Sequence, residues 1–505
     1  MSDAPAGHDD DAQSDVSPAN STTERDGKAD RSGVRLRHRT RELLENALPA
    51  DEAFRLDAER GNHDLLQLVR LLRIEGPLRP INPWEVEDPT GRQLINAGSY
   101  AALPFGEAYP GIIEVAQRFL ASAPSTIGFA QQSTSPWRAA LNDTLIGILS
   151  DVAPSHADSR VFLTNSGAEA IETAIKFARA ARPKATTLVN FRRGYHGKTL
   201  GALSLTPNEE YQAPFRPLLG PVRTLPYGET ETLVDAVHEI GPDKVQASVV
   251  EPVQGEAGVI SPPAGFLRAL GEFAAEHGIL VIADEIQTGL GRTGHWFASV
   301  AAGLDPDIIT LAKPLGGGIV PIGATIARRE IYGAMLHGLH SKLHSNTFGG
   351  GAFTCAVALR SLELIADEGL VEKARADGEY GLERLRAIQA AHPNLITAVR
   401  AAGMLFALQL KPVLPGRLLP IDPTLLPTLT AALGIAALHR SGVHACYSEN
   451  AEGIVRLTPP LTIPRTTLET LFDRVEEMAE RHKRPIGLLR LLSAGEMARL
   501  VRLAF

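Results

Sequence analysis

Two side chains of opposite charge stand at the ends of apolar runs, where burial would give each of them unusual chemistry. Asp284 follows the run ILVIA at residues 279–283, and Lys313 ends the segment DIITLAK at residues 307–313. A buried carboxylate without a partner is strongly unfavourable, so Asp284 must face a cation or carry a proton. Two partners are open at this point, namely Arg292 and a protonated ring nitrogen on a bound cofactor.

Lys313 is a cationic residue in a similar position, and its chemistry also depends on whether it is buried. Taken alone, it could be a surface lysine that ends a strand. If it is desolvated, however, its pKa falls below the ordinary value of about 10.4, and the neutral amine becomes a nucleophile that can form a Schiff base. A lysine Schiff base combined with an aspartate that faces a pyridine nitrogen is the arrangement used with pyridoxal phosphate, PLP. We therefore predict PLP as the cofactor, with Lys313 and Asp284 as the catalytic residues.

A PLP site also needs a place for the phosphate. Ser166, Gly167 and Ala168 open a predicted helix and could supply backbone N–H donors, a hydroxyl and the positive end of the helix dipole. Thr347, in the stretch HSNTFGGG, is a further candidate phosphate ligand. The glycine clusters PLGGG and FGGG lack the Gly-Lys-Ser/Thr ending of a P-loop, and no G-x-G-x-x-G follows the first strand. This pattern argues against a nucleotide site.

The cofactor ring needs contacts on both faces and at its hydroxyl. Tyr195 is placed to stack on one face, and Ile286, two residues beyond Asp284, is placed to cover the other. Gln287 is placed to hydrogen-bond the ring hydroxyl. These assignments complete a candidate cofactor site.

The elements that must position these residues are short apolar runs that alternate with helical patterns. Predicted helices include 168–182 and 263–278, and the predicted strands are 160–164, 187–191, 247–252, 279–285, 307–313 and 323–327. Apolar strands that alternate with helices indicate an α/β fold with a mostly parallel sheet covered on both faces. Ligands of such sheets lie beyond the carboxyl ends of the strands, so the polar residues that follow the strands are expected to form one site.

The domain organisation follows from changes in composition along the chain. The residue types predict a disordered tail at 1–33, a helical extension at 34–84 with patterns at 41–48 and 64–74, a large PLP-binding domain at 85–353, a smaller C-terminal α/β domain at 354–484 and a helical tail at 485–505. The three prolines of GPLRPINPW mark the end of the extension.

Composition excludes several classes of function. The 505 residues are 44% hydrophobic with a formal net charge of −8, so there is no basic excess for nucleic-acid binding. No stretch approaches the ~20 apolar residues of a membrane helix, and we expect no secretory signal. Cys355 and Cys446 are too few for a disulfide framework or a zinc cluster, which favours a reducing, cytoplasmic setting and no metal.

The chain resembles the class III, fold-type I PLP-dependent aminotransferases, which include ornithine, acetylornithine, 4-aminobutyrate and putrescine aminotransferases. The resemblance spans about residues 85–480. The stretches that carry it, in the order of the family, are TNSGAEAIETAIKFAR, YHGKTLGALSLT, EPVQGEAGV, LVIADEIQTGLGRTG, PDIITLAKPLGGGIVPIGA, NTFGGG and VRLTPPLTI. It implies a large domain built on a mostly parallel central sheet and a smaller C-terminal domain.

The resemblance also implies a role for each matching residue. Lys313 would form the Schiff base and Asp284 would hold the pyridinium nitrogen. Thr347 would reach the phosphate of the neighbouring subunit, which implies a homodimer. The cofactor-binding residues implied in this way are Ser166, Gly167, Ala168, Tyr195, His196, Glu251, Asp284, Ile286, Gln287, Lys313, Asn346 and Thr347.

The implied substrate residues are Arg456, Glu256, Lys198 and Tyr100. Arg456 would clamp a substrate carboxylate, and Glu256 resembles the gate that pairs with that arginine in ornithine-type enzymes. An unpaired Arg456 offers a bidentate fork for 2-oxoglutarate, whereas pairing with Glu256 hides its charge while an amine reacts. Lys198 stands where ornithine and acetylornithine branches usually have arginine, which favours a diamine donor. Pro314 in AKPLGGG and the stretch PFGEAYP are further departures from the family pattern.

The expected function is a ping-pong transfer of an amino group from an ω-amino acid or diamine, similar to putrescine or ornithine, to 2-oxoglutarate. A PLP enzyme of the same fold could instead be a racemase or epimerase, an aminomutase or a decarboxylase, or could act on a secondary-metabolite aldehyde. A racemase would need no oxo-acid acceptor. A non-catalytic binding protein is the remaining alternative, and it would show no cofactor absorbance.

Overall fold

The computed structural model describes residues 37–74, 76–125, 133–413, 426–448, 450, 453–493, 495, 496 and 499. The chain divides into two compact units, Met1–Gly61 and Asn62–Phe505. The first unit contains helices α1 (Thr40–Glu45) and α2 (Ala50–Arg60). The predicted disordered tail at 1–33 lies outside the described residues. The predicted helix at 41–48 corresponds to α1, which ends before Pro49, and α2 was not predicted.

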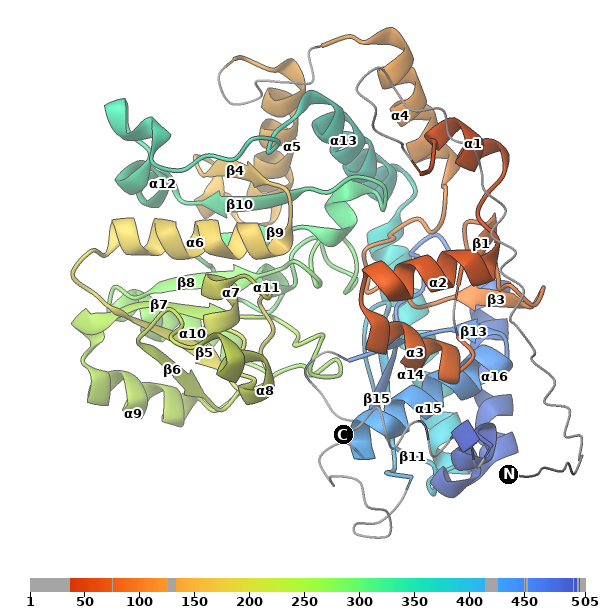
Figure 1. Cartoon of the computed structure of the whole chain (residues 1–505). Helices are drawn as coiled ribbons and strands as arrows, with labels where there is room; N and C mark the ends of the chain where they lie inside the picture. Colours follow the sequence, from red (N-terminus) through yellow and green to blue (C-terminus); the bar gives the residue numbers. More distant parts are fainter. Residues whose placement is uncertain are drawn as a thin grey trace, which may run out of the picture. The chain divides into compact units, whose positions relative to one another are not determined.

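A seven-stranded sheet forms the centre of the second unit (Figure 1). Its order is β4-β10-β9-β8-β7-β5-β6, and the five strands from β9 to β6 are parallel, whereas β10 runs antiparallel to both neighbours. The strands are β4 (Arg160–Thr164), β5 (Thr187–Phe191), β6 (Val222–Leu225), β7 (Val245–Val250), β8 (Leu280–Asp284), β9 (Ile308–Leu311) and β10 (Gly323–Ala327). This confirms the predicted α/β fold and all six predicted strands. The sequence VRTL of β6 is too short and polar to stand out.

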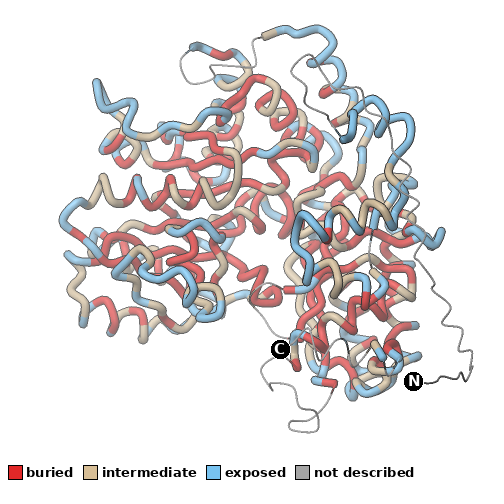
Figure 2. Tube along the Cα trace, viewed as in Figure 1, coloured by how far each residue is buried: buried red, intermediate tan, exposed pale blue. Residues whose placement is uncertain are grey.

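Helices cover both faces of this sheet, and its strands are almost entirely buried (Figure 2). Because successive strand residues point to opposite faces, Ile308 and Ile309 belong to different core clusters. The cluster of Ile308 includes residues of α6, α7 and α12, and the cluster of Ile309 includes residues of α5, α9, α10 and α13. The helices of this region are α4 (Pro110–Ser122), α5 (Pro136–Val152), α6 (Gly167–Ala181), α7 (Leu200–Ser204), α8 (Glu209–Gln212), α9 (Thr230–Ile240), α10 (Phe266–Glu276), α11 (Ala298–Ala301), α12 (Arg329–Met335) and α13 (Ala352–Asp367).

The C-terminal part has its own antiparallel sheet, ordered β11-β12-β15-β14. Its strands are β11 (Ile396–Ala402), β12 (Leu405–Leu410), β14 (Cys446–Tyr447) and β15 (Ile454–Leu457). Three helices pack around it, namely α14 (Leu370–Ala391), α15 (Leu426–Arg440) and α16 (Arg465–His482). Short 3-10 turns complete the second unit: η1 (Pro154–His156), η2 (Ala213–Phe215), η3 (Pro242–Lys244), η4 (Lys313–Gly316), η5 (Gly338–Lys342) and η7 (Pro485–Leu491).

A third sheet joins the start of the second unit to its C-terminal part. After α3 (His63–Leu71), strands β1 (Arg79–Asn82), β2 (Glu85–Glu87) and β3 (Gln93–Asn96) form a meander, and β3 pairs in parallel with β13 (Val443–His444). The predicted boundary between residues 84 and 85 therefore falls inside the β1–β2 hairpin. Of the three prolines of this stretch, Pro77 precedes β1, Pro80 lies within β1 and Pro83 lies in the turn to β2.

The C-terminal tail is described only in part. It begins with η7, in which Leu488 and Leu491 are buried, and most of the predicted helix beyond residue 493 lies outside the described residues. None of the described helices is both long enough and apolar enough to cross a membrane.

Candidate active site

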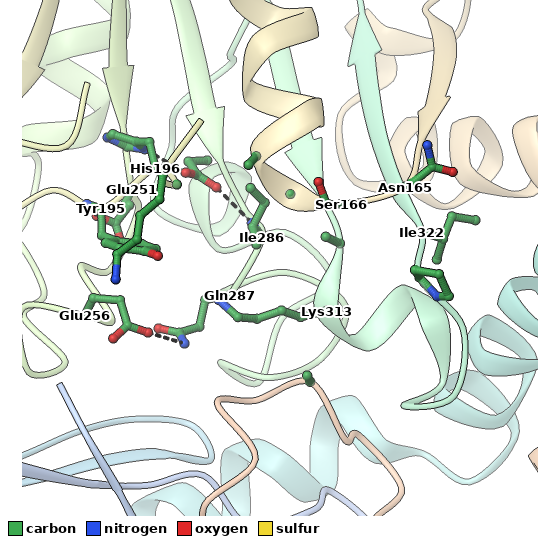
Figure 3. A pocket seen from close by; sticks show the side chains of 18 of the residues that line it. Asn165, Ser166, Tyr195, His196, Glu251, Glu256, Ile286, Gln287, Lys313 and Ile322 are labelled. Atoms are coloured by element: carbon green, nitrogen blue, oxygen red, sulfur yellow. Dashed lines mark hydrogen bonds and ion pairs between the residues drawn. The ribbon is translucent and has the colours of Figure 1, made fainter. Parts of the chain in front are cut away.

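A cavity of about 540 Å³ lies where the parallel strands of the large sheet end (Figure 3). The residues that follow β4, β5, β7, β8 and β9 all contribute to its wall, as expected for this topology. The predicted site residues that line it are Ser166, Gly167, Ala168, Tyr195, His196, Lys198, Glu251, Glu256, Asp284, Ile286, Gln287 and Lys313. Tyr195, His196 and Glu251 lie on one side, and Asn165 and Ser166 lie on the other.

Asp284 is buried at the end of β8, and its partner is a histidine. His196 Nδ1 donates to Asp284 Oδ2 at 2.7 Å. The other carboxylate oxygen accepts from the Ile286 backbone N–H at 3.1 Å and from the Thr310 hydroxyl at 3.3 Å. Burial lowers the pKa of His196, but the hydrogen bond and charge of Asp284, with a contribution from Glu251, outweigh burial and raise it. His196 is thus the partner of Asp284 within the described chain, and its raised pKa favours the protonated ring.

The alternative that Arg292 pairs with Asp284 is wrong. The Arg292 guanidinium instead donates to the backbone carbonyl groups of Pro459 at 2.6 Å and Met404 at 3.4 Å. Arg292 lies close to Asp284 in the sequence, but the turn after β8 directs its side chain toward the C-terminal part. The pairing of Asp284 with a cofactor ring nitrogen stays a prediction.

Lys313 follows β9 and starts the turn η4. Its φ is +29°, which is a strained backbone conformation for a residue other than glycine. Its side chain extends across the cavity toward Gln287 (Figure 3). Burial lowers the pKa of Lys313, and the charge of Arg456 lowers it further, against the opposing effect of nearby carboxylates such as Glu256. A larger neutral fraction makes this amine a better nucleophile and base.

The start of α6 forms the wall of the cavity opposite Tyr195, His196 and Glu251. Ser166 caps the helix by accepting from the Glu169 backbone N–H at 3.2 Å, and Glu169 in turn accepts from the Asn165 backbone N–H at 2.8 Å. A Cβ atom at Gly167 would lie 2.8 Å from Ile286 Cδ1, so only glycine lets the helix start approach the end of β8. The first-turn N–H groups of a 15-residue helix are thereby presented to the cavity, as anion binding requires.

Glu251 lies between two loops of the cavity wall. Its carboxylate accepts from the backbone N–H groups of Tyr195 at 2.9 Å and Gly255 at 3.2 Å. Burial raises the pKa of Glu251 to about 7, since the backbone donors and the charge of His196 offset only part of the desolvation. Although Glu251 lines the cavity, its contacts within the described chain are those of a residue that holds the wall in place.

Arg456 and Glu256 form a buried ion pair behind the cavity. Arg456 Nη2 lies 2.7 Å from Glu256 Oε2, and both side chains are at most 5% exposed. Gln287 joins them, since its amide donates to Glu256 at 3.3 Å and accepts from Arg456 at 3.3 Å (the Glu256–Gln287 contact is drawn in Figure 3). Burial lowers the pKa of Arg456, but Glu256 more than compensates and raises it. The ring of Tyr100 lies 5.6 Å from this guanidinium.

Four predicted residues do not line the cavity of this chain. Arg456 and Tyr100 stand behind Glu256 and Gln287. Asn346 donates to the Leu163 carbonyl at 3.0 Å, and Thr347 is exposed. Lys198 does reach the cavity edge, where it is exposed and its ammonium lies 4.4 Å from the centre of the Tyr211 ring.

Sequence reasoning missed one wall of the cavity, which is formed by Ala102 and residues 318–322. These residues carry no reactive groups, so residue type offers no signal. Gly318 is the exception, because its φ of +85° and a Cβ position 2.5 Å from Leu103 require glycine, and the run of three glycines that it ends could have indicated this close approach.

Comparisons with known proteins show which family and which solved structures the chain is similar to. A family model described as aminotransferase class-III matches residues 83–478. The chain is 27% identical to a crystal structure of an amine transaminase from an uncultivated Pseudomonas species in its PLP-bound form (TM-score 0.72), covering 81% of this chain and 96% of the other. It is 28% identical to an (S)-enantioselective omega-transaminase from Thermomicrobium roseum (TM-score 0.74) and 26% identical to an acetylornithine aminotransferase from Elizabethkingia anophelis (TM-score 0.67). Each of these two covers 86% of this chain and 99% of its own.

Proposed function

The chain belongs to the aminotransferase class-III family and is a PLP-dependent transaminase; we propose that it moves an amino group from an ω-amino acid or diamine to 2-oxoglutarate in a ping-pong cycle. The observation that carries the proposal is the single cavity in which Lys313, Asp284 and the start of α6 meet, with the Arg456–Glu256 pair behind it.

The residues of the cavity fit PLP. Lys313 would attach the aldehyde of the cofactor, the N-terminus of α6 would hold its phosphate, and Tyr195 and Ile286 would cover the two faces of its ring. Asp284 would hold the ring nitrogen, with Gln287 at the ring hydroxyl. When bound, PLP supplies a conjugated ring that takes up the electron pair left on the substrate carbon after proton removal.

Lys313 is the proton carrier in this proposal. Its amine has a lowered pKa and points into the cavity, so it can take a proton from the substrate carbon and return it elsewhere as general base and acid. The Asp284 carboxylate accepts from His196 at one oxygen and from the Ile286 N–H at the other. These contacts fix the orientation in which Asp284 would meet a cationic ring nitrogen.

Arg456 and Glu256 let one cavity serve two substrates. In the paired state seen here, the guanidinium is neutralised and suits a donor that has no carboxylate at that position. A dicarboxylic acceptor such as 2-oxoglutarate requires Glu256 to leave, so that Arg456 can bind the acceptor carboxylate bidentately. Lys198 at the cavity edge, in place of an arginine fork, favours a diamine or ω-amino donor.

The proposal includes a homodimer in which Thr347 reaches the phosphate of the neighbouring subunit. Thr347 is exposed, and exposed apolar residues flank it, namely Leu339 (100%), Leu343 (64%) and Phe348 (73%). Exposed apolar clusters of this kind are typical of subunit interfaces. The proposed setting is a reducing, cytoplasmic one, which the free buried thiols of Cys355 and Cys446 support.

Replacement of Lys313 tests the catalytic assignment. Lys313→Ala should abolish both borohydride-trappable cofactor and turnover, whereas the exposed control Lys184→Ala should retain both. Transamination by Lys313→Ala at the wild-type rate would refute the assignment.

A donor panel tests the substrate class. Putrescine, ornithine, acetylornithine, lysine, 4-aminobutyrate and aromatic amines are each offered with 2-oxoglutarate or pyruvate. We expect the highest kcat/KM for a diamine or ω-amino donor with 2-oxoglutarate. Conversion of an amino acid with no oxo acid present would identify a racemase or aminomutase instead.

A further inference from the structure

Two loops on neighbouring strands carry much of the cavity wall. The tyrosine loop, residues 194–198, follows β5 and carries Tyr195 and His196. The gate loop, residues 254–258, follows β7 and carries Glu256. One residue of each loop is held by the same carboxylate, since Glu251 accepts from the Tyr195 and Gly255 N–H groups.

Glu251 is itself held firmly. The Tyr227 hydroxyl donates to the Glu251 carbonyl at 2.7 Å and to the Pro252 carbonyl at 3.1 Å. At Gly255, a Cβ atom would lie 1.5 Å from Gln287 Oε1, so the gate loop lies directly against Gln287. The two loops are therefore tied to each other on the side of the sheet.

A segment of the C-terminal domain ties the same two loops a second time. The Asn450 side-chain amide donates to the Gly194 carbonyl at 2.8 Å, and the Asn450 backbone N–H donates to the Glu256 carbonyl at 3.1 Å. The Ser448 hydroxyl also donates to the Glu256 carbonyl, at 2.9 Å. Asn450 is thus the residue that contacts both loops from the other domain.

The same segment contacts the other half of the gate. The Tyr447 carbonyl accepts from Arg456 Nε at 3.4 Å and from Nη2 at 3.3 Å. Tyr447 therefore holds the Arg456 guanidinium, and Ser448 and Asn450 hold the Glu256 backbone. The Glu256 carbonyl is held by Ser448 and Asn450, and the N–H of the preceding Gly255 is held by Glu251. Glu256 can therefore leave Arg456 by rotating its side chain, without a shift of the gate loop.

We propose that Asn450 is a positioning residue that joins the tyrosine loop and the gate loop into one unit, so that substrate exchange at Arg456 leaves the Tyr195 wall of the cofactor site in place. The role of Asn450 in the reaction rests on the proposed function. The mechanical link between the two loops does not depend on that function. Asn450 touches neither the reacting atoms nor Arg456 with its side chain.

Hydrogen exchange of the holoenzyme without substrate tests the link directly. Asn450→Ala removes the tie to Gly194, together with the hydrogen bond that the Asn208 amide donates to Asn450 Oδ1 at 2.8 Å, and keeps the backbone N–H that contacts Glu256. Ser448→Ala removes a tie to Glu256 and leaves the tyrosine loop untouched. We expect each variant to speed exchange about fivefold in peptides covering both loops, which is the ratio expected for one neutral hydrogen bond. Peptides from α9 should not change, and the exposed control Asn394→Ala should change neither loop.

The deciding observation is whether removal of a contact to one loop also speeds hydrogen exchange in the other loop. Faster exchange only in the loop whose contact was removed, or in neither loop, would overturn the proposal. If Asn450→Ala does not fold, Ser448→Ala and the isosteric Asn450→Asp carry the test, because the latter also lacks the amide donor to Gly194.

A kinetic measurement separates positioning from gating. The donor and the 2-oxoglutarate half-reactions are each measured by the change in cofactor absorbance. If the loops form one unit, Asn450→Ala slows both half-reactions by similar factors. An effect on the 2-oxoglutarate half-reaction alone would overturn the proposal in favour of a gate-only role. Failure of the proposed donor class would show in the wild-type donor panel and would leave the exchange result unaffected.

Discussion

Arg292 and Arg456 have the two largest fully buried side chains in the described part of the chain, and their charges are neutralised differently. Arg456 lies 2.7 Å from a carboxylate of Glu256. Arg292 has only backbone carbonyl groups as partners, and its Nε and Nη2 atoms have no hydrogen-bond partner among the described residues. Burial lowers the pKa of Arg292 to about 9, whereas Glu256 overcomes the effect of burial and raises that of Arg456.

The difference supports the proposal that Arg456 recognises a substrate carboxylate, whereas Arg292 is a structural link. A carboxylate that pairs with an arginine can be replaced by the carboxylate of a substrate, because the two make the same bidentate contact. Backbone carbonyl groups cannot leave in this way, so Arg292 ties the turn after β8 to the C-terminal part of the chain. Burial alone therefore does not indicate whether an arginine binds a ligand. The identity of its hydrogen-bond partner does.

The two buried acids at the strand ends show the same contrast. Asp284 has a cationic partner in His196, whereas the nearest donors to Glu251 are backbone N–H groups. Burial accordingly raises the pKa of Glu251 to about 7. The first acid is paired with a side chain of the cavity wall, and the second holds two loops through their backbone N–H groups.

The largest expected effect is on activity at Arg456. Arg456→Met should slow the half-reaction with 2-oxoglutarate by about 100- to 1000-fold, because a bidentate charge-assisted contact of roughly 3–4 kcal/mol is lost. The donor half-reaction should slow by less than about tenfold. Single-turnover changes in cofactor absorbance measure both. Arg292→Met is the matched control and should not discriminate between the two half-reactions; equal losses in Arg456→Met would remove the distinction between the two arginines.

The second effect is on stability. Arg456→Met leaves the Glu256 carboxylate buried without a cation and should cost about 3–5 kcal/mol, part of which Glu256→Gln should restore in the double variant. Arg292→Met leaves only carbonyl groups unsatisfied and should cost about 1–3 kcal/mol. Denaturant unfolding followed by circular dichroism compares the variants. Equal costs at both positions, with no recovery in the double variant, would contradict the comparison.

The smallest effect is the pH dependence at Glu251. Because its pKa is raised from 4.5 to about 7 in the folded chain, the native state holds this proton more tightly than the unfolded state. The associated stability is full below pH 4.5 and is lost as the pH rises to about 7. The unfolding free energy of the wild type, relative to Glu251→Gln, should therefore fall by about 1–3 kcal/mol between pH 5 and pH 8. Parallel stability curves over this range would show that Glu251 does not titrate there.

Much of the fold could be predicted from the sequence, because its strands are buried on both faces and appear as uninterrupted apolar runs. The segments RVFLT, TLVNF and GATIA coincide with β4, β5 and β10. In contrast, β6 was missed because it lies at the sheet edge, where two of its four residues carry polar side chains. The hairpin at residues 79–87 does not stand out in the sequence, because the prolines of a turn and of a linker look alike.

The sequence predicts those site residues that directly follow a recognisable strand or start a recognisable helix. Lys313, Asp284 and the capped start of α6 line the cavity as expected, since each follows a recognisable strand. The proposal of Arg292 as partner of Asp284 failed because nearness in sequence does not set the direction of a side chain. The partner, His196, is 88 positions away.

The sequence by itself determined which elements form and which reactive groups stand at their ends, because apolar runs, helix caps and the residues that follow strands act over a few neighbouring positions. Only the tertiary structure decided which charged side chains form pairs with one another. It placed Glu256 and Gln287 against Arg456, and it placed Asn450 against Gly194, 256 positions earlier in the chain. Such contacts depend on how separate parts of the chain pack, and a buried charge accepts whichever partner that packing brings within hydrogen-bond distance.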